Sequence, residues 1–227
     1  MTADPRLAIA YQDEHLLVVD KGPGLVVHPA RGHREDTLSQ LLAPLLAGGE
    51  PERAGIVHRL DRDTSGLLVV SRSQEVHRRL QAALAGRRIE REYLALVEGR
   101  PPARTGTIEA PIGRDPRIRT RMAVGGVSPR EARTHFTLER ALVGSSLLRL
   151  RLETGRTHQI RVHLQAIGHP LYGDPEYGTP GTLGLERQFL HATRLAFEHP
   201  LTGERIDVSS PLPPDLQSAL ERAEQLS

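Results

Sequence analysis

Residues 58–66, with the sequence HRLDRDTSG, place a carboxylate among cations and turn-forming residues. They lie between the apolar lead-in 54–57 and the strand-like run 67–70. A short polar segment between two rigid elements can aim a side chain into a cleft, where the carboxylate of Asp61 could act as a nucleophile. A structural interpretation is also open, in which Asp61 and Thr64 only stabilise a turn.

A second segment that could carry chemistry is 152–178, which is rich in arginine and histidine. Its pattern predicts a strand, a glycine turn and then a helix from about residue 157 to residue 167. On that helix His158, Arg161 and Gln165 share a polar face at spacing i, i+3, i+7. We therefore expect the Arg161 cation to be presented from a rigid element.

The elements that position these segments are those of a mixed α and β chain. Alternation predicts strands at residues 7–11, 15–20, 67–71, 90–97, 134–138, 147–152, 187–198 and 206–209. Helices are expected at 37–46 and 73–85, with Thr37 and Ser73 as N-caps, and at the C-terminal end. Because strands arrive in groups and not in strict alternation with helices, an α+β fold with a largely antiparallel sheet is expected.

Composition limits the class of protein. The 227 residues can bury the core of one large domain or of two small lobes. The chain has no cysteine, which excludes disulfides and thiolate zinc sites and favours a reducing, cytoplasmic location. No apolar run approaches the roughly 18 residues that a membrane span needs, so we expect no membrane partner.

Arginine dominates the basic residues, and Lys21 is the only lysine. Guanidinium groups bind phosphates and stack on bases, which suits RNA, although a GC-rich genome would produce the same bias. Residues 113–133 hold six arginines against two acids, a local excess of four. Their glycines and prolines predict a mobile loop that binds RNA phosphates, with a solvated surface loop as the alternative.

The string 58–66 resembles the signature of the RluA-type RNA pseudouridine synthases. The resemblance implies that Asp61 is the catalytic nucleophile and that Arg59 enters the stack vacated by the target base. Residues 152–178 are similar to a later motif of that family, which implies that Arg161 pairs with the catalytic carboxylate. Residues 91–99 are similar to a third motif, in which the match to Tyr93 lies against the target base; a buried core tyrosine is the alternative. We further expect RNA contacts from His58, Arg156, His158, Arg117, Arg119 and Arg121.

The resemblance covers residues 7–212 and implies the pseudouridine synthase fold. That fold has a mixed, largely antiparallel central sheet flanked by helices and loops, with the catalytic cleft across the sheet. We expect one catalytic domain over 1–227, with 213–227 as a C-terminal helix and without an S4 domain. The match is greatest to the RluD-like branch, which modifies large-subunit ribosomal RNA. One departure is Lys21-Gly22-Pro23, where the family has a Lys-Pro step.

The implied chemistry moves uracil from an N1–C1′ to a C5–C1′ linkage, which needs no redox change and no cofactor. The Asp61 carboxylate could attack C1′ or C6, or assist a glycal route. Arg161 beside it would lower its pKa and aim it. Tyr93 would offer a flat ring to the base, which must first leave its stack.

Several alternatives remain open at this point. We expect 23S ribosomal RNA as the substrate of a monomeric enzyme, with tRNA as the alternative. Two rival classes are a hydrolase or nuclease that uses His58 or His158 as general base, and a non-catalytic ribosomal RNA-binding module. Residues His158, His163, His169 and Asp174 could suggest a metal site, but the first two are five apart and diverge on a helix, so no metal is expected.

Overall fold

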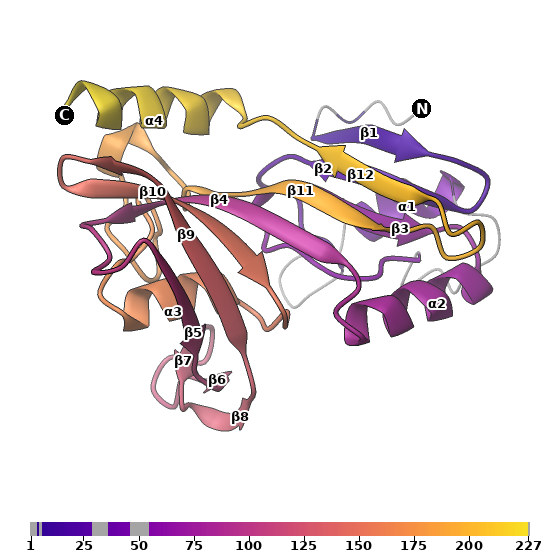
Figure 1. Cartoon of the computed structure of the whole chain (residues 1–227), viewed down its shortest axis with the longest axis horizontal. Helices are drawn as coiled ribbons and strands as arrows, with labels where there is room; N and C mark the ends of the chain where they lie inside the picture. The colour runs from indigo at the N-terminus through magenta and orange to yellow at the C-terminus, as the bar shows by residue number, and fades with distance from the viewer. Residues whose placement is uncertain (1–3, 5, 29–35, 46–54, 227) are drawn as a thin grey trace. The chain divides into compact units, whose positions relative to one another are not determined.

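The computed structural model describes residues 4, 6–28, 36–45 and 55–226. The chain divides into two compact units (Figure 1). The first unit comprises Met1–Arg91 and Ala192–Pro211, and the second comprises Glu92–His191 and Leu212–Ser227. Within the described ranges, each helix is too short or too polar to cross a membrane.

Strands of the first unit form antiparallel ladders. β1 (Leu7–Gln12) and β2 (Leu16–Lys21) make the hairpin that the sequence predicts, and β2 pairs in turn with β3 (Ser65–Ser71). Most of β11 (Leu190–Glu198) also belongs to this unit and pairs with β12 (Arg205–Ser209). All seven residues of β3 are buried, so the strand that follows the signature segment is a rigid support for it.

Helix α2 (Gln74–Ala85) covers the core of this unit. It begins where expected, because the Ser73 side chain accepts a hydrogen bond from the Val76 N–H. Val76 and Leu80, one turn apart, bury their side chains in the core. The other core residues come from the strands and from the chain beside them: Leu16, Val18, Val57, Leu67, Val69, Ile89, Leu195, Phe197 and Ile206.

The predicted helix at 37–46 is present only in part. α1 (Leu38–Leu42) begins at a capping box formed by Thr37 and Gln40 and continues as a 3-10 turn over Ala43–Leu45. Leu46 lies outside the described residues.

Gly66, the last residue of the signature, has a backbone conformation and a neighbour that both demand glycine. Its φ is +111°, in the region that L side chains rarely adopt. A Cβ at this position would lie 2.3 Å from the carbonyl oxygen of Ala192. The motif's glycine is therefore explained by the close approach of two backbones.

The second unit is built on four adjacent antiparallel strands. In spatial order they are β4 (Glu90–Glu98), β10 (Ser145–Leu152), β9 (Arg133–Leu142) and β5 (Thr105–Glu109). Helix α4 (Pro214–Gln225) packs on this sheet through a buried apolar cluster. The cluster joins Leu216, Ala219, Leu220 and Ala223 of the helix to Leu96, Leu147, Leu185 and Phe189.

The prediction of a loop over 113–133 is wrong in part, because strands form within that range. The structure has a separate three-stranded antiparallel sheet in the order β7 (Met122–Val124), β6 (Ile112–Arg114) and β8 (Val127–Arg130) (Figure 1). We call these strands, with the connection 115–121, the basic sheet. Its strands are too short for alternation to reveal them. Its glycines permit close backbone approach: a Cβ on Gly113 would lie 2.5 Å from the Val127 carbonyl oxygen.

The predicted helix at 157–167 is α3 (Gln159–Ala166). Its N-cap residue is His158, with a φ of 55° in the left-handed region. Arg161 is carried by this helix as expected, but its side chain is only 5% exposed, and the sequence pattern did not predict that burial. The reason is packing that helical spacing cannot show, since α3 contacts both β7 and β9.

Candidate active site

Asp61 lies in a tight turn within the signature segment, residues 58–66. The Thr64 N–H donates to the Asp61 carbonyl oxygen at 3.1 Å, and the Asp61 side chain is half-buried. Thr64 and Ser65 are buried and lead directly into β3. Asp61 therefore does occupy a turn, and this turn directly precedes the rigid strand β3.

Lys21 holds this turn through hydrogen bonds to the main chain. Its side chain is fully buried, and its Nζ donates to the carbonyl oxygens of Arg62 and Gly22, each at 2.8 Å. The residue after Asp61 is thus tied to the end of β2. Sequence reasoning missed this role, although a single lysine in an arginine-rich chain was a signal that could have drawn attention to it.

His58 is bound to β3. Its Nε2 accepts a hydrogen bond from the Val69 N–H at 3.3 Å, which places the proton of the neutral ring on Nδ1. Burial, and then the positive charge of Arg91, lower the pKa of His58 to about 3. His58 is therefore neutral at pH 7, and this geometry supports neither a cationic phosphate contact nor a general base at this position.

Arg59 and Leu60 point in opposite directions. The Arg59 side chain is exposed, while Leu60 is buried and anchors the segment in the first unit. An exposed guanidinium two residues before Asp61 is compatible with insertion into an RNA stack. That role stays a prediction.

Tyr93 belongs to the second unit and lies on β4, with 4% of its surface exposed. It is opposite Leu150 of β10, which is opposite Phe136 of β9, so the three side chains form one row across the sheet. The burial fits the alternative of a core tyrosine, and the catalytic role of Tyr93 stays a prediction.

Arg161 is held by two carboxylates of the segment that follows α3. Its Nε and Nη2 donate to the two carboxylate oxygens of Asp174 at 2.7 and 2.8 Å, and Nη2 also donates to Glu176 at 2.8 Å. This fork fixes one edge of the guanidinium in a set direction. Sequence reasoning missed Asp174 as the partner of Arg161.

Asp174 is fully buried and charged. Burial alone would raise its pKa, but hydrogen bonds and the positive charge from Arg161, with the N–H groups of Glu176 and Tyr177, hold the pKa below its usual value. The positive charge of Arg161 is therefore already compensated by the Asp174 carboxylate of the same unit. Its contribution to any further carboxylate is more one of orientation than of added positive charge.

The histidines considered as metal ligands have other partners. The ring nitrogens of His163 hydrogen-bond to Thr134 Oγ1 and to the Ala110 carbonyl oxygen, and His169 Nδ1 bonds to the Glu98 carbonyl oxygen. Across the described ranges, no three His, Asp or Glu side chains gather in a way that could hold a metal ion.

The remaining predicted RNA contacts lie in the second unit. Arg117 and Arg119 are exposed on the basic sheet, and Arg121 is half-buried. The Arg156 Nε donates to the Glu131 carbonyl oxygen at 2.9 Å, and His158 Nδ1 bonds to Tyr177 Oη at 2.9 Å. Their contacts with RNA stay predictions.

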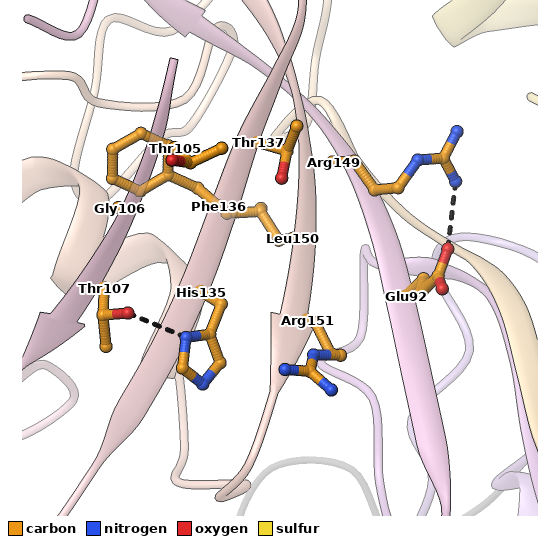
Figure 2. Close-up of a pocket in the computed structure, with 10 residues that line it drawn as sticks. All are labelled: Glu92, Thr105, Gly106, Thr107, His135, Phe136, Thr137, Arg149, Leu150 and Arg151. Atoms are coloured by element: carbon orange, nitrogen blue, oxygen red, sulfur yellow. Dashed lines mark hydrogen bonds and ion pairs between the residues drawn. The ribbon is translucent and has the colours of Figure 1, made fainter. Parts of the chain in front are cut away.

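A hollow of about 410 Å³ lies over β5, β9, β10 and β4 (Figure 2). One row across it joins Thr107, His135, Arg151 and Glu92, in which Thr107 Oγ1 bonds to His135 Nδ1 at 2.8 Å. Successive residues of a strand point to opposite faces, so the Glu92 and Tyr93 side chains lie on opposite faces of β4. The lining of the hollow also includes Leu150 and Phe136, which share a row with Tyr93.

Comparison with known proteins gives the chain its family. The family model described as RNA pseudouridylate synthase matches residues 15–166. An uncharacterized RNA pseudouridine synthase of Chloroflexus aurantiacus is 54% identical over 89% of this chain. Ribosomal large subunit pseudouridine synthase D of Nitrosomonas europaea is 47% identical over 97% of it. The chain spans 65% and 66% of the lengths of these two relatives.

Solved structures agree with these relatives. Human RNA Pseudouridylate Synthase Domain Containing 1 is 31% identical with a TM-score of 0.73, and the match covers 94% of this chain and 87% of that one. Human RNA Pseudouridylate Synthase Domain Containing 4 is 27% identical with a TM-score of 0.74, covering 95% and 92%. The expected α+β pseudouridine synthase fold is confirmed. The chain belongs to the RNA pseudouridylate synthase family.

Proposed function

We propose that this protein isomerises uridine to pseudouridine in RNA. The observation that carries the proposal is the signature turn: Asp61 lies in the turn that precedes the fully buried strand β3, in a chain whose residues 15–166 match the family. The neutral, strand-bound His58 weakens the version of the rival hydrolase that uses His58 as its general base. The proposal includes no cofactor, because the isomerisation changes neither oxidation state nor composition.

Asp61 is the proposed nucleophile, and Arg161 is the proposed cation that aims it. The Asp174 carboxylate accepts from Nε and Nη2 of this guanidinium and Glu176 accepts from Nη2 as well, so these carboxylates fix the direction of the Arg161 cation. Tyr93 is the proposed platform for the extruded uracil. Asp61 belongs to the first unit, and Arg161 and Tyr93 belong to the second.

The proposed substrate is large-subunit ribosomal RNA, modified in the cytoplasm by a single catalytic domain acting as a monomer. Support comes from the relatives of Nitrosomonas europaea and Zymomonas mobilis, both named ribosomal large subunit pseudouridine synthase D. Transfer RNA is the alternative substrate. The exposed arginines of the basic sheet suit the phosphates of either RNA.

Release of tritium from RNA labelled at C5 of uridine tests the activity directly, because the isomerisation replaces the C5 hydrogen. The purified chain should release tritium from large-subunit ribosomal RNA without shortening it. Shortened RNA would favour the nuclease, and binding without release would favour the non-catalytic module. Pseudouridine mapping of total RNA, from cells with and without the gene, then identifies the substrate.

A further inference from the structure

The ring of Tyr177 contacts two arginines for which the sequence predicted different roles. The Cζ of Arg161 is 4.9 Å from the centre of its ring, and the Cζ of Arg121, from the basic sheet, is 5.6 Å from the same centre. Both distances are within the range of a cation–π interaction. One aromatic ring therefore contacts the proposed catalytic cation and a proposed RNA-binding cation.

The hydroxyl of Tyr177 joins the same two regions. It accepts a hydrogen bond from the backbone N–H of Met122 on β7 at 2.8 Å, and it bonds to Nδ1 of His158 at the start of α3 at 2.9 Å. Burial raises the pKa of Tyr177 to about 12, so the hydroxyl keeps its proton at neutral pH and can donate it to His158. The ring is thereby fixed from the basic sheet and from α3 together.

Apolar packing strengthens this connection. Ile112 of β6, Ala132 and Val162 of α3 form a buried cluster, and Met122 and Tyr177 pack against it. The basic sheet therefore packs against α3, the helix that carries Arg161. A displacement of β7 cannot leave Tyr177 in place without breaking its hydrogen bond to Met122.

We propose that Tyr177 is a positioning residue, which fixes the plane of the Arg161 guanidinium and keeps it aligned with the RNA-binding arginines of the basic sheet. The Asp174 carboxylate sets the edge of the guanidinium, and the Tyr177 ring sets its face. The carboxylate and the ring therefore restrict the orientation of the guanidinium together. The inference rests on the proposed function, in which Arg161 aims Asp61.

Three variants test the role of Tyr177. Tyr177→Leu removes both the ring and the hydroxyl, and Tyr177→Phe keeps the ring over Arg161 but removes the bond to Met122. Tyr172→Phe is the matched control, because the Tyr172 hydroxyl donates to the Gly144 carbonyl oxygen in the same unit. At saturating RNA, the single-turnover rate should fall about 30-fold for the Leu variant, as for a loss of about 2 kcal/mol, and about threefold for the Phe variant. RNA affinity should stay within about threefold of wild type in both, and the control should match wild type.

A double-mutant cycle separates positioning from simple structural support. If Tyr177 acts through Arg161, the rate lost to Tyr177→Leu is smaller in the Arg161→Lys background than in wild type. Losses that multiply in the double variant would overturn the proposal. So would a Leu variant whose folded fraction alone accounts for its lost rate, or one that keeps the wild-type rate.

The outcome can be distinguished from failure of the proposed function. If Asp61→Asn or Arg161→Met keeps substantial turnover, the proposed catalytic roles are wrong. If those two variants are inactive while Tyr177→Leu turns over normally, only the positioning role is wrong.

Discussion

The signature turn of the first unit and the arginine of the second are positioned in different ways. The turn is held through its main chain: Lys21 binds the Arg62 carbonyl oxygen, Thr64 binds that of Asp61, and His58 binds the Val69 N–H. Arg161 is held through its own guanidinium, by the carboxylates of Asp174 and Glu176.

Because the two residues are held differently, substitutions of Asp61 and of Arg161 should differ in their effects on activity and on stability. The hydrogen bonds to the carbonyl oxygens of Arg62 and Asp61 hold the main chain of the turn, and the amide of asparagine keeps the shape of the Asp61 carboxylate, so we expect the turn to survive that exchange. Removing the Arg161 guanidinium would leave Asp174 as a buried, uncompensated carboxylate. Variants of the two residues should therefore both lose activity, but only one should lose stability.

The largest effect is expected for Asp61→Asn. The amide is nearly isosteric but a much weaker nucleophile, so tritium release should fall at least about 1000-fold while RNA affinity changes less than about threefold. Asp63→Asn is the matched control, since Asp63 forms a half-exposed ion pair with Arg62; it should stay within about threefold of wild type. Substantial turnover by the Asn variant would remove Asp61 from the nucleophile's role.

Arg161→Met should lose both activity and stability. We expect tritium release to fall at least about 100-fold and the free energy of unfolding to fall by about 3–5 kcal/mol, because Asp174 loses its partner. The double variant Arg161→Met/Asp174→Asn should regain most of that stability in urea titrations and stay inactive. Recovery of activity together with stability would show that Arg161 is only structural.

Lys21→Met tests the main-chain anchor. The carbonyl oxygens of Arg62 and Gly22, whose hydrogen bonds to Lys21 are partly buried, would lose this donor, at a cost of about 1–3 kcal/mol in unfolding free energy. The rate should fall about tenfold at a temperature where the variant is folded, because the turn loses its fixed position. A variant as inactive as Asp61→Asn but as stable as wild type would contradict the anchoring role.

The smallest effect is a change in pH dependence. The folded-state pKa of His58 is about 3, below the ordinary 6.5, so the unfolded chain takes up a proton that the folded chain does not. The stability that depends on neutral His58 is complete above pH 6.5 and is lost as the pH falls towards 3. His58→Gln keeps an acceptor for the Val69 N–H without titrating, so its stability should fall by about 2 kcal/mol less than wild type between pH 7 and pH 5. Parallel urea titrations at the two pH values measure this, and equal losses would show that His58 is protonated in the folded state.

Local patterns predicted much of this fold. The β1–β2 hairpin, the Ser73 cap of α2, β3 and the α+β class were readable because each depends on residues a few positions apart. The basic sheet was not readable, because three-residue strands carry too little alternation.

The site was predicted less completely than the fold. The signature turn was located from its residues, but its support was not, because Lys21 and Arg62 are 41 positions apart. The burial of Arg161 was missed for a similar reason. Helical spacing places a residue on a face, and only tertiary packing decides whether that face meets water or an Asp174 thirteen positions away.

Lys21 has a practical consequence for following this molecule in solution. It is the only lysine of the chain, and its ε-amine is sealed inside the first unit. An amine-reactive reagent can therefore modify a lysine side chain only when the signature turn opens. The rate of that modification, followed by mass spectrometry of the peptide that contains Lys21, reports how often the proposed active site opens locally. RNA that binds over the turn should slow the modification of Lys21. The measurement needs no engineered label.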